Sequence, residues 1–126
     1  MNDTAPPLAG KRVLVVEDEP LLRELVAEAF TRERAQAEAA TDGEEGWTLW
    51  RTGRYDLVVS DQRMPTCTGL ELLGRIRDSG SEIPFILMSG YGLEGLTETL
   101  ASDPRVRTLS KPFRLDRLFT LAASLL

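Results

Sequence analysis

The stretch VVSDQRMP, residues 58–65, places one carboxylate, Asp61, where a short apolar run meets a turn. Leu57, Val58 and Val59 are apolar and mostly β-branched, which at this short length favours a buried strand over a helix. Ligands of open α/β sheets gather outside the carboxyl ends of the strands, so an acid at such an end is a candidate site residue. Taken alone, Asp61 fits equally well as an ordinary acid in the turn that ends a strand.

Apolar runs and helical patterns alternate along the rest of the chain. Strands are predicted over residues 13–16, 35–40, 57–61, 85–88 and 106–110, and helices over about 20–32, 44–51, 70–78, 93–101 and 115–125. The segment 35–40, AQAEAA, is a poor strand by propensity and is predicted only because a short strand is needed between two helices. The helix over 93–101 has little apolar support and should be the least stable. This fivefold alternation predicts an α/β fold, a doubly wound five-stranded parallel sheet of the (βα)5 type with right-handed crossovers.

Composition limits the class of protein. With 126 residues, 42% hydrophobic and 28% charged, the chain is predicted to form one soluble domain with an ordinary core. No apolar run approaches the roughly 18 residues of a membrane span, and the start of the chain lacks the pattern of a signal peptide. We therefore predict a flexible lead over residues 1–10, a single domain over 11–126 and a cytoplasmic location without membrane contact. The net charge of −5 argues against nonspecific nucleic-acid binding through the whole surface.

Two residue counts restrict the chemistry. The single cysteine, Cys67, cannot form a disulfide within the chain. The chain has no histidine, which excludes Ser-His and Cys-His nucleophile pairs, histidine metal ligands and a phosphohistidine relay within this chain. Any chemistry must therefore use carboxylates, hydroxyls, lysine and the backbone.

Polar side chains follow four of the five predicted strands. Glu17 and Asp18 follow the first strand, Asp61 the third, Ser89 the fourth and Lys111 the fifth. A parallel sheet would bring them to one edge, where two acids about 5 Å apart repel by about 3 kcal/mol at an effective dielectric near 20. Mg²⁺ relieves such repulsion, while a lysine and a hydroxyl can hold phosphoryl oxygens. The chemistry that fits is phosphoryl transfer onto Asp61.

The motifs that carry these residues resemble the receiver domain of bacterial two-component response regulators. They are VLVVEDEP, TDGEEGW, DLVVSDQRMP with the following TGLELL, FILMSG and LSKPF, in this order over residues 11–126. The resemblance implies a flavodoxin-like fold in which Asp61 is the phosphoacceptor. It also implies that Asp18, Asp61 and the backbone carbonyl of Arg63 bind Mg²⁺ or Mn²⁺, while Glu17 holds the metal through water.

The resemblance further implies roles for two more residues and a partner. Ser89 would be the switch hydroxyl, and Lys111 the phosphate partner, with a cis peptide bond allowed before Pro112. The donor would be a phosphohistidine on a sensor histidine kinase or a histidine phosphotransfer protein. The domain would catalyse only its own phosphorylation and dephosphorylation, without direct nucleic-acid contact, as a monomer or weak dimer. Its motifs are also similar to those of receivers at the C-terminus of hybrid sensor kinases.

Two departures from the family pattern concern the signal that the domain sends. Thr108 stands where the family often has Tyr or Phe, three residues before the lysine, so the usual aromatic reporter is missing. Tyr91, two residues after Ser89, is either its substitute or simply an exposed loop aromatic. Arg63 and Tyr91 occupy positions that influence water access to the acyl phosphate in this family, so the phosphate lifetime does not transfer from relatives.

Two other function classes share some of these features. An Asp-nucleophile phosphatase also places a metal-binding acid after a strand, but such enzymes carry a second acid two residues later, where this chain has Arg63. A docking module that is never phosphorylated is disfavoured by the complete set of acids, hydroxyl and lysine. Phosphoryl acceptance therefore remains the prediction from sequence.

Overall fold

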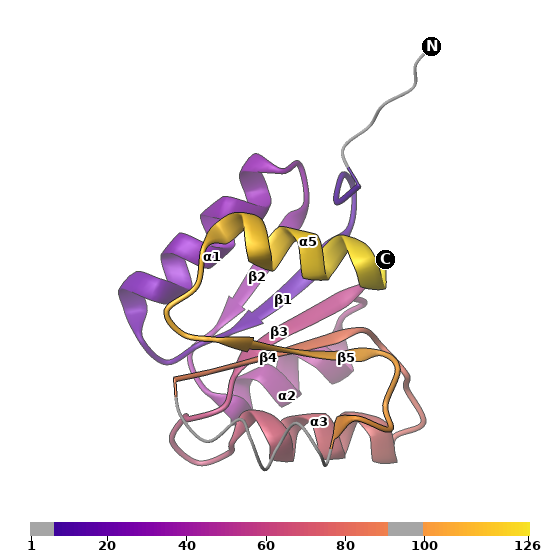
Figure 1. Ribbon diagram of the computed structural model, residues 1–126. Coiled ribbons are helices and arrows are strands. Elements are labelled where there is room, and N and C mark those ends of the chain that lie inside the picture. The colour runs from indigo at the N-terminus through magenta and orange to yellow at the C-terminus, as the bar shows by residue number, and fades with distance from the viewer. Residues whose placement is uncertain (1–6, 91–99) are drawn as a thin grey trace.

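The computed structural model describes residues 7–90 and 100–126, in which strands and helices alternate (Figure 1). All five strands form one parallel sheet with the order β2-β1-β3-β4-β5, which confirms the predicted doubly wound α/β fold. The helix predicted over 93–101 falls almost entirely outside the described residues. In chain order the elements are β1 (Arg12–Val16), α1 (Pro20–Arg32), β2 (Gln36–Ala40), α2 (Gly43–Thr52), β3 (Leu57–Asp61), α3 (Gly69–Asp78), β4 (Phe85–Ser89), β5 (Val106–Ser110) and α5 (Leu115–Leu125).

Strand β2, which had the weakest support in the sequence, is an edge strand of this sheet. It pairs with β1 along its whole length, from Arg12 opposite Gln36 to Val16 opposite Ala40. Most of its side chains are partly or fully exposed, and only Ala40 is buried. An edge position tolerates low strand propensity because pairing with a buried neighbour, rather than side-chain packing, holds the segment.

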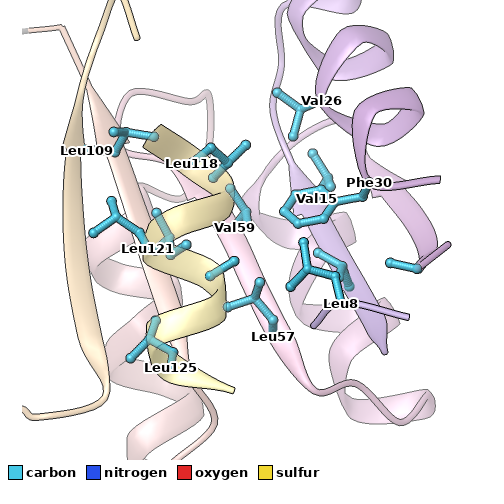
Figure 2. Packing of buried hydrophobic residues seen from close by; sticks show 14 of the residues in the cluster. Leu8, Val15, Val26, Phe30, Leu57, Val59, Leu109, Leu118, Leu121 and Leu125 are labelled. Atoms are coloured by element: carbon cyan, nitrogen blue, oxygen red, sulfur yellow. The ribbon is translucent and has the colours of Figure 1, made fainter. Parts of the chain in front are cut away.

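Helices cover both faces of the sheet, α1 and α5 on one side and α2 and α3 on the other (Figure 1). Alternate side chains of β1 divide between two apolar clusters, Val15 toward α1 and α5 and Leu14 toward α3. Figure 2 shows Phe30 of α1 and Leu118 of α5 in the first cluster, and both are fully buried. Full burial of such a side chain stabilises the fold by about 1.5–3 kcal/mol relative to exposure.

Side-chain caps fix where three helices begin, and each cap lies in the turn that follows a strand. Glu19 accepts hydrogen bonds from the backbone N–H groups of α1, and Asp42 accepts one from α2. Thr68 and Glu71 form a reciprocal capping box at the start of α3. Because each cap supplies acceptors for otherwise unpaired N–H groups, the loops between strands and helices have defined conformations.

The described part of the N-terminal lead is tied to the core. Leu8 is only 2% exposed within the cluster under α1 and α5, and the N–H of Gly10 donates to the carbonyl of Arg34. Ordered packing therefore begins inside the segment that was predicted to be flexible. Residues 7–90 and 100–126 contain no helix with the length and apolar character needed to cross a membrane.

Candidate functional site

The strand ends singled out in the sequence meet at one edge of the sheet. Asp61 is the last residue of β3 and Ser89 the last residue of β4, while Glu17 directly follows β1 and Lys111 directly follows β5. These four strands are consecutive neighbours in the sheet and all run in one direction. Parallel pairing therefore gathers side chains from distant parts of the sequence, as ladders of this kind require.

Three carboxylates lie together at this edge. Each of Glu17, Asp18 and Asp61 offers an oxygen, and these atoms all lie within 4.8 Å of one another. Glu17 and Asp61 are buried, whereas Asp18 is exposed to solvent. Hard divalent cations bind carboxylate and carbonyl oxygens in proteins, so the donor set has the chemistry of a Mg²⁺ site open to solvent on one side.

Lys111 provides the positive charge in the cluster. Its Nζ lies 3.1 Å from Oε1 of Glu17 and 3.0 Å from Oδ1 of Asp61. Its side chain is 24% exposed, so the two ion pairs are only partly screened by water. One ammonium group thus contacts two of the three carboxylates of the cluster.

The ionisation of the cluster reflects this crowding. Burial is the largest influence on Glu17 and raises the pKa of its carboxyl, an effect that the backbone N–H of Glu19 opposes and the charge of Asp61 reinforces. Burial would by itself lower the pKa of Lys111, but its hydrogen bonds and ion pairs with Asp61 and Glu17 outweigh burial and raise that pKa above its usual value. Lys111 is therefore a permanent cation at this edge.

The turn after β1 holds its acids through backbone bonds. The N–H of Glu17 donates to the carbonyl of Ala40, which extends the β1–β2 ladder by one residue. Oε2 of Glu17 accepts the N–H of Glu19 at 3.0 Å, and Nη1 of Arg23 donates to the carbonyl of Glu17 at 3.0 Å. These bonds fix the chain direction at the point where Asp18 projects its carboxylate into the cluster.

Gly69 supports the position of Asp61, a role that sequence reasoning missed. A Cβ atom at Gly69 would overlap the carbonyl oxygen of Asp61 and Cδ1 of Leu87, so the first residue of α3 packs directly on the end of β3. Oγ of Ser60 donates to the same carbonyl at 2.9 Å. The available signal was a glycine at the first position of a helix, where other residues are usually preferred.

The remaining predicted residues lie at or near the same edge. Ser89 is 1% exposed, and its backbone carbonyl accepts the N–H of Lys111 at 2.8 Å. Arg63 is exposed in the loop between β3 and α3, and Thr108 is half-buried in β5 opposite Leu87. The peptide bond before Pro112 is cis. Tyr91 lies outside the described residues, so the choice between a substitute for the missing aromatic and an ordinary loop aromatic stays open.

Comparison with known proteins connects this geometry to a family. The family model of the response regulator receiver domain matches residues 13–123. The transcriptional regulatory protein TcrA of Mycobacterium tuberculosis is 34% identical over 114 residues, which are 89% of this chain and 44% of that protein. The sensor kinase CckA of Brucella abortus is 33% identical over 127 aligned positions, and the match covers 98% of this chain and 13% of that protein. The chain thus spans less than half the length of these relatives.

A solved structure extends the comparison to the backbone. The response regulator protein TrrA of Thermotoga maritima, crystallised in complex with Mg²⁺-BeF, is 36% identical to this chain. It superimposes with a TM-score of 0.81, covering 92% of this chain and 99% of the other. Sequence and fold therefore agree over nearly the whole domain.

Proposed function

Because the chain belongs to the response regulator receiver domain family, we propose that Asp61 is its phosphoacceptor and that phosphorylation requires Mg²⁺ or Mn²⁺. Receiver domains are signalling modules that accept a phosphoryl group, and we assign that chemistry here to particular residues. One observation carries it: the carboxylates of Glu17, Asp18 and Asp61 lie within 4.8 Å of one another while Nζ of Lys111 lies 3.0 Å from Asp61.

In the proposed step, a carboxylate oxygen of Asp61 attacks the phosphorus of a phosphohistidine. The new O–P bond makes an acyl phosphate, and the P–N bond breaks with its electron pair going to the imidazole, which leaves. Nζ of Lys111 lies 3.0 Å from Oδ1 of the attacking carboxylate, where its ammonium group would stabilise the charge that spreads over the phosphoryl oxygens. Ser89, buried at the end of β4, would donate its hydroxyl to a phosphoryl oxygen once the group is in place.

The donor set fits a divalent cation. Asp18, Asp61 and the backbone carbonyl of Arg63 would bind it directly, and Glu17 would reach it through water. The cation would neutralise negative charge of the cluster and of the incoming phosphate. Glu17 is better suited to an outer role because Lys111 already contacts one of its oxygens and the N–H of Glu19 the other.

The partner follows from the chemistry of the donor. This chain has no histidine, so the phosphohistidine must come from another domain, which we propose is a sensor histidine kinase or a histidine phosphotransfer protein in the cytoplasm. Similarity to the sensor kinase CckA supports this choice, because a region of that protein matches 98% of the chain. The domain itself would catalyse only its own phosphorylation and dephosphorylation.

Intact-mass measurement tests the assignment. The protein is incubated with acetyl phosphate and Mg²⁺, and we expect a gain of one phosphoryl group that disappears when the metal is chelated or in Asp61→Asn. No gain in the wild-type protein, or a gain that survives Asp61→Asn, would contradict the proposal. Steady release of phosphate from added phosphatase substrates would instead support a phosphatase.

A further inference from the structure

Gln62, the residue directly after Asp61, closes the loop between β3 and α3 by three hydrogen bonds. Its backbone N–H donates to the carbonyl of Met88 in β4 at 2.8 Å. Its backbone carbonyl accepts the N–H of Gly69 at 3.1 Å, and its side-chain Oε1 accepts the N–H of Leu70 at 2.8 Å. One residue therefore joins the end of β3 to the sheet on one side and to the start of α3 on the other.

The start of α3 shows why the side chain of Gln62 matters. The first N–H groups of a helix have no partner inside the helix and need acceptors from elsewhere. The third N–H, of Glu71, donates to Oγ1 of Thr68 at 3.1 Å, while Oε1 of Glu71 accepts the N–H of Thr68 at 2.8 Å. The first two, of Gly69 and Leu70, both bond to Gln62. Gln62 thus completes the cap that Thr68 and Glu71 form, and it does so from the end of the loop next to Asp61.

The loop closed in this way carries the backbone carbonyl of Arg63. The bond from Gly69 to the Gln62 carbonyl orients the peptide plane that precedes the Arg63 carbonyl, and the side-chain bond to Leu70 joins Gln62 to the start of α3. At the far end of the loop, Cys67 is buried against Gly43, where a Cβ atom would lie 2.5 Å from Cβ of Cys67. The two ends of the loop are therefore fixed independently, and Gln62 fixes the end next to the acceptor.

We infer that Gln62 is a positioning residue for the cation site, acting through its side-chain bond to Leu70 to aim the Arg63 carbonyl at the carboxylate cluster. The inference rests on the proposed function, since it assumes that this carbonyl is a metal ligand. Mg²⁺ requires nearly ideal octahedral geometry, so a carbonyl on a loosened loop is a poor ligand. Removing a residue that orients a metal ligand typically weakens metal binding by about 10- to 100-fold. We expect a loss in about this range here.

The test removes hydrogen-bond acceptors from the start of α3 at two positions, Gln62 and Thr68. Gln62→Leu removes the acceptor for Leu70 and keeps the approximate shape of the side chain, while Gln62→Asn keeps the amide but is one methylene too short to reach. Thr68→Ala is the matched control, because it removes the other side-chain cap of the same helix. Mg²⁺ dissociation constants are measured by calorimetry, and amide exchange of residues 70–73 reports the loosening of α3 in each variant.

We expect both Gln62 variants to bind Mg²⁺ about tenfold more weakly than the wild type, and Thr68→Ala to bind it with unchanged affinity although α3 exchanges faster. Wild-type affinity in both Gln62 variants would overturn the inference, as would an equal loss in Thr68→Ala, which would make the effect one of helix stability alone. Failure of the wild-type protein to bind Mg²⁺ or to be phosphorylated would instead overturn the proposed function.

Discussion

Charged side chains are arranged differently at the two ends of the sheet. At the carboxyl ends of the strands, Glu17, Asp18 and Asp61 crowd around the single ammonium group of Lys111. At the amino ends, two acids are each held by a single donor group. Asp56 accepts the N–H of Arg12 at 2.8 Å before β3, and the Nε of Arg77 donates to Asp103 at 2.9 Å before β5.

This difference separates function from stability within one small domain. Like charges held together raise the free energy of the folded protein until a ligand neutralises them. The amino ends use charge only to join loops to strands and helices. We therefore expect substitutions at the carboxyl ends to change stability in a way that depends on metal, and those at the amino ends to change it in the same way with or without metal.

The largest effect is expected when the ammonium group of Lys111 is removed from the carboxylate cluster. In the metal-free protein, Lys111→Met leaves Glu17 and Asp61 buried without their shared partner. Breaking a buried ion pair costs about 3–5 kcal/mol, and because Lys111 is partly exposed we expect a loss of about 2–3 kcal/mol in the free energy of unfolding. Urea denaturation in the presence of a chelator measures it.

Arg117→Met is the matched control for Lys111→Met. Arg117 is exposed on α5, and the loss of an exposed charge typically changes stability by less than about 0.5 kcal/mol. Equal effects of the two substitutions would mean that Lys111 does not hold the acidic cluster together.

Metal addition provides the second test of the crowded end. A ligand that binds only the folded state stabilises it by about 2.7 kcal/mol at a concentration 100 times its dissociation constant. We expect Mg²⁺ to raise the unfolding midpoint of the wild-type protein, and to have little effect in Asp18→Asn, which lacks one of the three carboxylates. An equal rise in Asp18→Asn would show that Mg²⁺ binds elsewhere.

The crowded end was predictable from sequence because strand ends are local features. Apolar runs mark where β1, β3, β4 and β5 stop, and parallel pairing then brings Glu17, Asp61, Ser89 and Lys111 to one edge. Four of the strands and the acidic cluster follow from patterns a few residues long, whereas β2 was expected only because a strand was needed between two helices. The roles assigned to individual site residues stay predictions, because their test is chemical.

The supports of the site were not predictable in the same way. Gln62 caps a helix that starts seven residues later, and Gly69 contacts the backbone of Asp61 only because the loop between them turns back. Arg77 and Asp103 meet across 26 positions of the sequence. Such contacts depend on loop conformation and on the placement of whole helices, which no short pattern specifies.

Two glycines of α3 give the third test, since one touches the crowded end and the other does not. Gly69→Ala forces a methyl group against the Asp61 carbonyl and Leu87, and we expect the overpacking to cost about 2 kcal/mol. At Gly74 a Cβ would have nothing within 4 Å, so Gly74→Ala should stabilise the helix by about 0.5–1 kcal/mol. Thermal or urea unfolding measures both, and the same sign for the two substitutions would contradict the proposed packing.

The smallest change in the free energy of unfolding should come from a substitution at the amino ends of the strands, at Asp103, and it should depend on pH. The Asp103 carboxyl is partly buried, which would raise its pKa, but the bonds from Arg77 and from the N–H of Arg105 outweigh burial and lower that pKa below the usual 3.8. A carboxyl with a lowered pKa in the folded protein stabilises it above the unfolded value, and the stabilisation is lost as the pH falls through the folded value.

Asp103→Asn tests this end with little change of shape. The variant keeps an oxygen for the N–H of Arg105, which donates at 2.9 Å. Its NH2 group replaces the oxygen that accepts from Nε of Arg77, so the charge and the hydrogen bond that face Arg77 are both lost. It is preferable to replacing Arg77, whose Nη2 is buried without a hydrogen-bond partner among the described residues, so that its removal would relieve one cost while adding another.

We expect Asp103→Asn to lower the free energy of unfolding by about 1 kcal/mol near neutral pH, where a partly buried pair contributes more than an exposed one. The difference from wild type should shrink as the pH falls from 3.8 through the lowered pKa of the folded protein, where the Asp103 carboxyl becomes protonated and loses its charge. Urea denaturation across this range, with and without Mg²⁺, measures it. Because Asp103 lies at the end of the sheet away from the carboxylate cluster, the difference should be the same in both conditions, and a dependence on Mg²⁺ would show that the two ends are coupled.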